Sequence, residues 1–300
     1  MSSEQVQAHV DRIIERSQAR EARRAARLAQ LQSTTAGLAA PAGLTGPAPV
    51  LVAEGDSWFN YPGTDILEEL EGLNYDVRSV SNAGDTLQSM AYDEKQLDKL
   101  NDRLMKLARK NRVPKAILLS AGGNDIAGEE FVLLLNHARS GLGTLSESIV
   151  EALIDVRLRD AYIALIRKIA GLNQANFGQP DLPVVVHGYD YPVPDGRGFW
   201  GGWGPLPGPW LRPGFRRQGY EDLAANTDTM RILIDRFNDM LTTLTSEPDF
   251  QHVHYVNLRG TLSNTVADKA YKDDWDNEMH PEDHGFVRLA KKFQTILGTL

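Results

Sequence analysis

Five short apolar runs, separated by longer stretches with helical periodicity, are the feature of this sequence that most restricts its fold. Continuous apolar strands that alternate with helices are typical of a parallel sheet covered on both faces. We therefore predict an α/β protein, a three-layer α/β/α sandwich with a five-stranded parallel sheet. Its strands are expected at residues 50–56, 75–81, 116–123, 182–190 and 252–258, and its helices at 64–72, 86–111, 128–138, 145–174, 221–244 and 282–298.

The first 49 residues differ from this pattern. Residues 1–33 contain neither Gly nor Pro, which predicts a helical arm, but its apolar stripe is thin and needs a partner surface. Small residues with Pro and Gly at 34–49 predict a linker, so the main domain is expected at 50–300. We expect the arm to dock on this domain or on a second copy of the chain, in a homo-oligomer.

Charge and cysteine content exclude several classes of protein. The chain carries 40 acidic and 32 basic residues, a net charge of −8, which indicates no general affinity for nucleic acid. It has no cysteine, and this excludes a disulfide framework, a zinc ribbon and a thiol nucleophile. No apolar run approaches the ~20 residues that span a bilayer. The charged N-terminus lacks the apolar segment of a signal peptide. We therefore expect a cytoplasmic protein, unless a signal-less route exports it.

Residues that can carry chemistry follow the predicted strands. In an open parallel sheet, ligands gather at the carboxyl ends of the strands. Ser57 follows the first strand, Gly84 the second and Asn124 the third, while His280 precedes the helix expected at 282–298. A hydroxyl nucleophile, a base for its proton and donors for an oxyanion are sufficient for acyl transfer.

These residues lie in four blocks that resemble those of the SGNH hydrolases, also called the GDSL esterase/lipase family. The first block reads Gly-Asp-Ser at 55–57, the second contributes Gly84, and the third reads Gly-Gly-Asn-Asp at 122–125. The family's Asp-X-X-His is matched only in part, because Asn277 stands three residues before His280. The blocks keep the family's order along the predicted domain.

The resemblance implies a role for each residue. Ser57 would be the nucleophile and His280 its general base. The N–H groups of Ser57 and Gly84 and the side-chain amide of Asn124 would bind the oxyanion. These residue types suit the roles, since glycine lets the backbone approach a substrate oxygen and an asparagine amide is a neutral donor.

The sequence departs from the family at the residue that supports His280. An aspartate orients the imidazole and also stabilises the imidazolium, whereas Asn277 can do only the first. The charge could come from Asp274 or Glu278, while Asp276 is expected to point away. We expect Asn277 to orient His280, with a neighbouring acid or none supplying the charge. On this view Asn277→Asp should keep or raise turnover.

An aromatic loop rich in Gly and Pro interrupts the alternation at 193–219. Loops this long inside a compact domain are usually functional or disordered, and the aromatic content argues against disorder. One interpretation is a satellite core under the loop. The other is a substrate pocket wall near Ser57, formed by Trp200 and Trp203 together with Trp58.

We expect neither a metal nor a cofactor. His252 and His254 share one face of a predicted strand, but no third ligand is evident nearby, and polar alternation on an outer face explains them. The predicted function is serine-dependent hydrolysis of a small-molecule, lipid or sugar ester through an acyl-enzyme, as in an esterase, lipase or O-acetylesterase. The alternatives are a thioesterase or acyltransferase with the same site, and a non-hydrolytic adaptor that works through the basic N-terminal helix.

Overall fold

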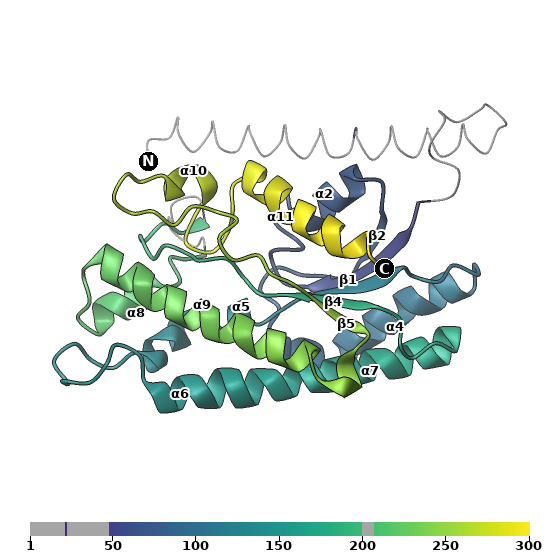
Figure 1. Ribbon diagram of the computed structural model, residues 1–300, viewed down its shortest axis with the longest axis horizontal. Coiled ribbons are helices and arrows are strands. Elements are labelled where there is room, and N and C mark those ends of the chain that lie inside the picture. The colour runs from purple at the N-terminus through teal and green to yellow at the C-terminus, as the bar shows by residue number, and fades with distance from the viewer. Residues whose placement is uncertain (1–21, 23–47, 200–206) are drawn as a thin grey trace.

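The computed structural model describes residue 22, residues 48–199 and residues 207–300, and a five-stranded sheet lies at its centre (Figure 1). Neighbouring strands run parallel, as the sequence predicts, and their order is β2-β1-β3-β4-β5. The strands are β1 (Val50–Gly55), β2 (Asp76–Ser79), β3 (Ala116–Ser120), β4 (Val184–His187) and β5 (Val253–Val256).

Helices cover both faces of this sheet, which confirms the three-layer α/β/α arrangement (Figure 1). On one face, α11 (Asp283–Leu297) packs beside α2 (Ile66–Gly72). On the other, α7 (Arg159–Phe177) lies between α4 (Glu94–Ala108) and α9 (Leu223–Thr245). The central strands β1, β3 and β4 are buried at every position, which is why their runs are continuously apolar.

Two of the expected helices are wrong in detail. The helix expected at 86–111 is two helices, α3 (Leu87–Tyr92) and α4, because Asp93 adopts an extended conformation and its carboxylate accepts the Lys95 N–H at 2.8 Å. The helix expected at 128–138 is a short 3₁₀ segment, Glu129–Leu134, after which Leu135 pairs with Leu145.

The remaining elements are short or irregular. A π-helical stretch, Ala152–Leu158, joins α6 (Glu147–Glu151) to α7 without a break. The other short segments are α5 (Gly123–Ile126), α8 (Arg212–Arg217), the 3₁₀ turn Pro248–Phe250 and α10 (Tyr271–Asp274). Within the described ranges, no helix is long and apolar enough to cross a membrane. The arm expected at 1–33 lies outside these ranges apart from Ala22, as does most of the linker expected at 34–49.

The direction of the chain across the sheet reverses beside β1. From β1 the chain crosses to β2 on one side, then returns to β3 on the other side and continues outward to β5. Connections that leave neighbouring strands in opposite directions open a crevice at their carboxyl ends. Because Ser57 follows β1 and Asn124 follows β3, the topology places both at this crevice.

The carboxyl end of β1 also buries an acidic side chain, Glu54. Its Oε1 accepts hydrogen bonds from the Gly55 N–H and from Gln96 Nε2, each at 3.2 Å. Gln96 also donates to Asp85 in the loop after β2. Burial, and then the nearby charge of Asp85, raise the pKa of Glu54 to about 8. Glu54 is therefore protonated at neutral pH.

This protonation predicts how Glu54→Gln changes stability with pH. The folded-state pKa lies above the unfolded one, so the wild-type chain loses stability as pH rises from about 5 to 8. Glutamine does not titrate, so the melting temperature of Glu54→Gln relative to wild type should increase over this range, by about 3 °C or more. Thermal unfolding at pH 5, 6, 7 and 8 measures this. A constant difference across the series, equal to that of the exposed control Glu151→Gln, would contradict it.

Candidate active site

Two residues that lie 223 positions apart in the chain meet at the crevice. Ser57 occupies the turn that follows β1, and His280 stands just before α11. His280 Nε2 lies 2.7 Å from Ser57 Oγ. This distance is that of a direct hydrogen bond between a hydroxyl and an imidazole nitrogen.

The Asn277 side chain fixes the orientation and the tautomer of His280. Asn277 Oδ1 accepts the backbone N–H groups of Met279 at 2.9 Å and of His280 at 3.0 Å. Two N–H donors identify this atom as the oxygen. The same oxygen lies 2.9 Å from His280 Nδ1, so Nδ1 must carry the proton. His280 Nε2 is then unprotonated, and the Ser57 hydroxyl donates its hydrogen bond to it.

The His280 ring lies in an aromatic and largely dry environment. It is 6% exposed, stacks on Tyr61 with centroids 4.3 Å apart, and meets the edge of Trp210 at 5.6 Å. Burial lowers the pKa of His280 to about 3, so the ring is neutral at physiological pH. A neutral imidazole with a free nitrogen directed at a hydroxyl is suited to act as a general base.

Neither candidate acid, Asp274 nor Glu278, is hydrogen-bonded to His280, and both carboxylates have other partners. Asp274 accepts the Ser263 N–H at 2.6 Å and pairs with His284 and Arg288. Burial would raise the pKa of Asp274, but these three partners outweigh it and lower the pKa.

Glu278 instead anchors the aromatic loop. Its fully buried carboxylate accepts four backbone N–H groups at 2.7–3.1 Å. They belong to Gly196, Trp210, Leu211 and Arg212, on both sides of the segment 200–206, which lies outside the described residues. Burial raises the pKa of Glu278, although the four donors oppose this.

The residues proposed for the oxyanion lie on three loops that are tied together. Asn124 Nδ2 donates to the Asp85 carbonyl at 2.9 Å, next to Gly84, whose φ of +89° favours glycine. Asp125 accepts the Leu87 N–H at 2.7 Å and so joins the same two loops. In the described part of the chain, the N–H groups of Ser57 and Gly84 have no hydrogen-bond acceptor, and Asn124 Nδ2 has a second N–H to donate.

A buried carboxylate, Asp56, holds the turn that carries Ser57. Its Oδ1 accepts the Ser120 hydroxyl at 2.7 Å and the Trp58 N–H at 3.0 Å, and its Oδ2 accepts the Tyr189 hydroxyl. Tyr189 in turn accepts the Gly123 N–H at 3.1 Å. Burial raises the pKa of Asp56 to about 6. Neither Ser120 nor Tyr189 was predicted as a site residue, although Ser120 lies within one predicted strand and Tyr189 lies near the end of another.

Of the three tryptophans expected in the pocket wall, the structure describes Trp58. Trp58 is only 2% exposed, and its indole N–H donates to the Met279 carbonyl at 2.9 Å. It therefore joins the Ser57 turn to the segment that precedes His280, and it also lines a small cavity. Trp200 and Trp203 lie outside the described residues. Among the described residues, no group of three or more His, Asp or Glu side chains could hold a metal ion.

Comparison with known proteins finds similar folds among hydrolases. No family model and no curated protein matches the chain. A carbohydrate acetylesterase from Sinorhizobium meliloti is 13% identical, with a TM-score of 0.46 over 84% of this chain and 99% of the other. A protein described as an SGNH hydrolase from Slackia heliotrinireducens is 12% identical, with a TM-score of 0.47 over 83% and 98%.

A third solved structure, described as a GDSL-like lipase from Parabacteroides merdae, is 14% identical, with a TM-score of 0.45 over 87% of this chain and 100% of the other. The structural neighbours are thus SGNH- and GDSL-like hydrolases and acetylesterases, at low identity and high coverage. Their descriptions name the same family as the one that the four sequence blocks resemble.

The position of Glu278 predicts a loop-anchoring role. Glu278→Gln replaces an acceptor oxygen by an NH₂ group that faces N–H donors, which should cost about 1–3 kcal/mol of stability. Hydrogen exchange should rise at residues 196–199 and 207–212. The control Glu247→Gln removes a part-exposed ion pair with Arg159 and should cost less than about 1 kcal/mol. Equal costs for the two variants, with exchange at the loop unchanged, would contradict the anchoring role.

Proposed function

We propose that this protein is a serine-dependent hydrolase of carboxylic esters that works through an acyl-enzyme. The observation that carries the proposal is the 2.7 Å contact between Ser57 Oγ and His280 Nε2, with the opposite ring nitrogen held by Asn277 at 2.9 Å. A nucleophile that is hydrogen-bonded to a base, which a third group orients, is the signature of nucleophilic acyl transfer.

The first half of the reaction acylates Ser57. Ser57 Oγ attacks the ester carbonyl carbon while its proton moves to His280 Nε2, and the carbonyl π electrons move to the oxygen. The resulting oxyanion accepts hydrogen bonds from the Ser57 and Gly84 N–H groups and the Asn124 amide, and each such donor is typically worth about 100- to 1000-fold in turnover. As the oxyanion collapses, the bond to the alkoxy oxygen breaks, and His280 returns the proton to the leaving alcohol.

The second half regenerates the enzyme. Water replaces the alcohol, His280 Nε2 takes one of its protons, and the hydroxide oxygen attacks the acyl carbon. The second oxyanion occupies the same three donors. Its collapse breaks the bond to Ser57 Oγ, which takes back the proton from His280, and the carboxylic acid leaves. The resting His280 ring is neutral over the physiological range, so its Nε2 is free to accept the proton in each half of the reaction.

A small cavity beside the site favours a short acyl group. Its volume is about 30 Å³, and since about 10–15 Å³ is enough to hold one water molecule, the cavity has room for a small group such as a methyl. Trp58, Gly123 and Met279 line it, and each adjoins a residue of the proposed site in the chain. The other lining residues are mostly apolar and include Met230 of α9. We expect the acetyl methyl group of a substrate to occupy this cavity.

Ser57→Ala tests the proposal. The variant should keep its fold, because Ser57 is only half-buried and the hydrogen bond of its hydroxyl is to His280, and should lose hydrolysis of p-nitrophenyl acetate by at least roughly a thousandfold. The exposed loop variant Ser140→Ala should retain wild-type rates. Steady-state kinetics with circular dichroism of each pure variant measures this. Unchanged hydrolysis by folded Ser57→Ala would refute the assignment.

Acyl preference tests the cavity. Wild-type kcat/KM should fall as the acyl chain of p-nitrophenyl esters lengthens from two to eight carbons. Met230→Ala enlarges the cavity and should move the preference toward longer chains, whereas Met240→Ala, the same change on the same helix outside the cavity, should not. Each truncation costs about 2–5 kcal/mol of stability, so assays belong well below both melting temperatures. Identical chain-length profiles for the two variants would exclude the cavity as the acyl site.

A further inference from the structure

A carboxylate lies behind the Asn277 side chain without touching His280. Asn277 Nδ2 donates hydrogen bonds to Asp276 Oδ2 at 3.0 Å and to Tyr61 Oη at 2.9 Å. The Tyr61 hydroxyl donates to the same Asp276 oxygen at 2.6 Å. His280, Asn277 and Asp276 therefore form a continuous row in which the amide stands between the imidazole and the carboxylate. Asp276 was expected to point away from His280, and its carboxylate is directed at Asn277 and Tyr61 rather than at the ring.

Tyr61 holds both ends of this row. Its ring stacks on His280 with an interplanar angle of 17°, while its hydroxyl binds Asp276. Burial, and then the charge of Asp276, raise the pKa of Tyr61 far above its usual value. The hydroxyl therefore stays protonated and acts as a donor toward the carboxylate.

The Asp276 carboxylate faces Asn277 and Tyr61 and not a cation. Arg197, whose guanidinium lies nearby, pairs with Asp195 at 2.6 Å and donates to the backbone carbonyls of Trp275 and Asp276. Within residues 48–199 and 207–300, the Asp276 carboxylate has no basic partner at ion-pair distance. Its only side-chain partners there are Tyr61 and Asn277.

We propose that Asp276 is a positioning residue that acts through Asn277 and supplies the negative charge that stabilises the His280 imidazolium. The inference rests on the proposed function, because the imidazolium forms when Ser57 transfers its proton. A carboxylate that accepts from the amide N–H polarises the amide, and hydrogen bonds in such a chain strengthen one another. The amide oxygen facing His280 Nδ1 thereby becomes a stronger acceptor.

This arrangement also gives a physical reason for asparagine at position 277. A carboxylate there would replace the N–H that now bridges the 3.0 Å to Asp276 Oδ2, and two like charges at that distance oppose each other. The expectation that Asn277→Asp alone keeps or raises turnover therefore does not follow from the structure. The change is compatible with the site when Asp276 is neutralised at the same time.

A charge swap tests the inference. Asp276→Asn removes the charge and keeps the shape, and should lower kcat for p-nitrophenyl acetate by roughly 10- to 100-fold with KM changed less than about twofold. The double variant Asp276→Asn/Asn277→Asp moves the charge one residue closer to His280 and should restore kcat to within a few-fold of wild type. A purely structural role for Asp276 would not produce this recovery.

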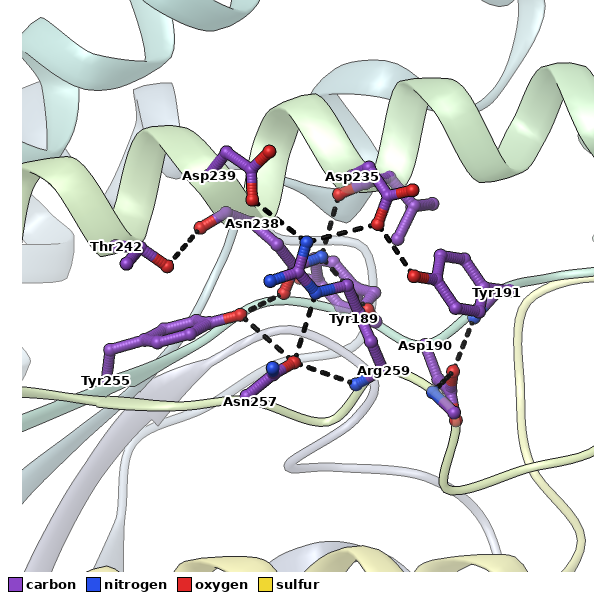
Figure 2. Close-up of polar contacts among 12 residues, drawn as sticks. Tyr189, Asp190, Tyr191, Asp235, Asn238, Asp239, Thr242, Tyr255, Asn257 and Arg259 are labelled. Atoms are coloured by element: carbon purple, nitrogen blue, oxygen red, sulfur yellow. Dashed lines mark hydrogen bonds and ion pairs between the residues drawn. The ribbon is translucent and has the colours of Figure 1, made fainter.

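The matched control is Asp235→Asn. Asp235 of α9 accepts the Tyr191 hydroxyl at 2.6 Å, the same contact that Asp276 makes with Tyr61, and its other partner is Arg259, which is not a residue of the proposed site (Figure 2). This variant should keep wild-type kcat. Wild-type kcat in folded Asp276→Asn, or a folded but inactive double variant, would overturn the inference. If Asp276→Asn does not fold, the kcat of the double variant tests the inference. Activity that survives Ser57→Ala would instead refute the proposed function.

Discussion

The fixed orientation of the Asn277 side chain is the constraint on which the proposed site depends. Its oxygen faces the N–H groups of Met279 and His280, and its nitrogen faces Tyr61 and Asp276, so the amide fits in one orientation only. That orientation requires a proton on His280 Nδ1 and leaves Nε2 free for Ser57. A neutral amide thereby sets the tautomer that the aspartate sets in a Ser-His-Asp triad.

The rest of the fold places the loops that carry Ser57, Gly84 and Asn124 next to His280 and Asn277. The reversal of chain direction beside β1 places the loops after β1, β2 and β3 around one crevice, and the buried Asp56 carboxylate joins the ends of β1, β3 and β4. The β4 end is held from the α9 side, where Asn238 Nδ2 donates to the Tyr189 carbonyl at 3.2 Å, within the network of Figure 2. Burying such carboxylates is costly, and each is accordingly surrounded by donors.

The sheet could be predicted from the sequence because buried parallel strands produce continuous apolar runs between helices, and all five runs form strands. The break between the helices at Asp93 could not be predicted from the sequence. A single capping aspartate within a helical pattern looks the same as an aspartate on the solvent-exposed face of a continuous helix. The resemblance to the family's Asp-X-X-His pattern indicated the pairing of Asn277 and His280, whereas Tyr61 contacts Asp276 across 215 residues, and no local pattern reports such a contact. Glu278 looked like a candidate acid because of its nearness in sequence, but its carboxylate turns toward backbone N–H groups of the loop.

The central claim is that Ser57 is the nucleophile that His280 activates. The most direct measurement is reaction of the wild-type chain with an organophosphate ester, followed by peptide mass spectrometry to locate the adduct. The account predicts a single stoichiometric phosphoryl adduct on Ser57. An adduct on a different residue, or no adduct on a folded chain that hydrolyses p-nitrophenyl acetate, would contradict it.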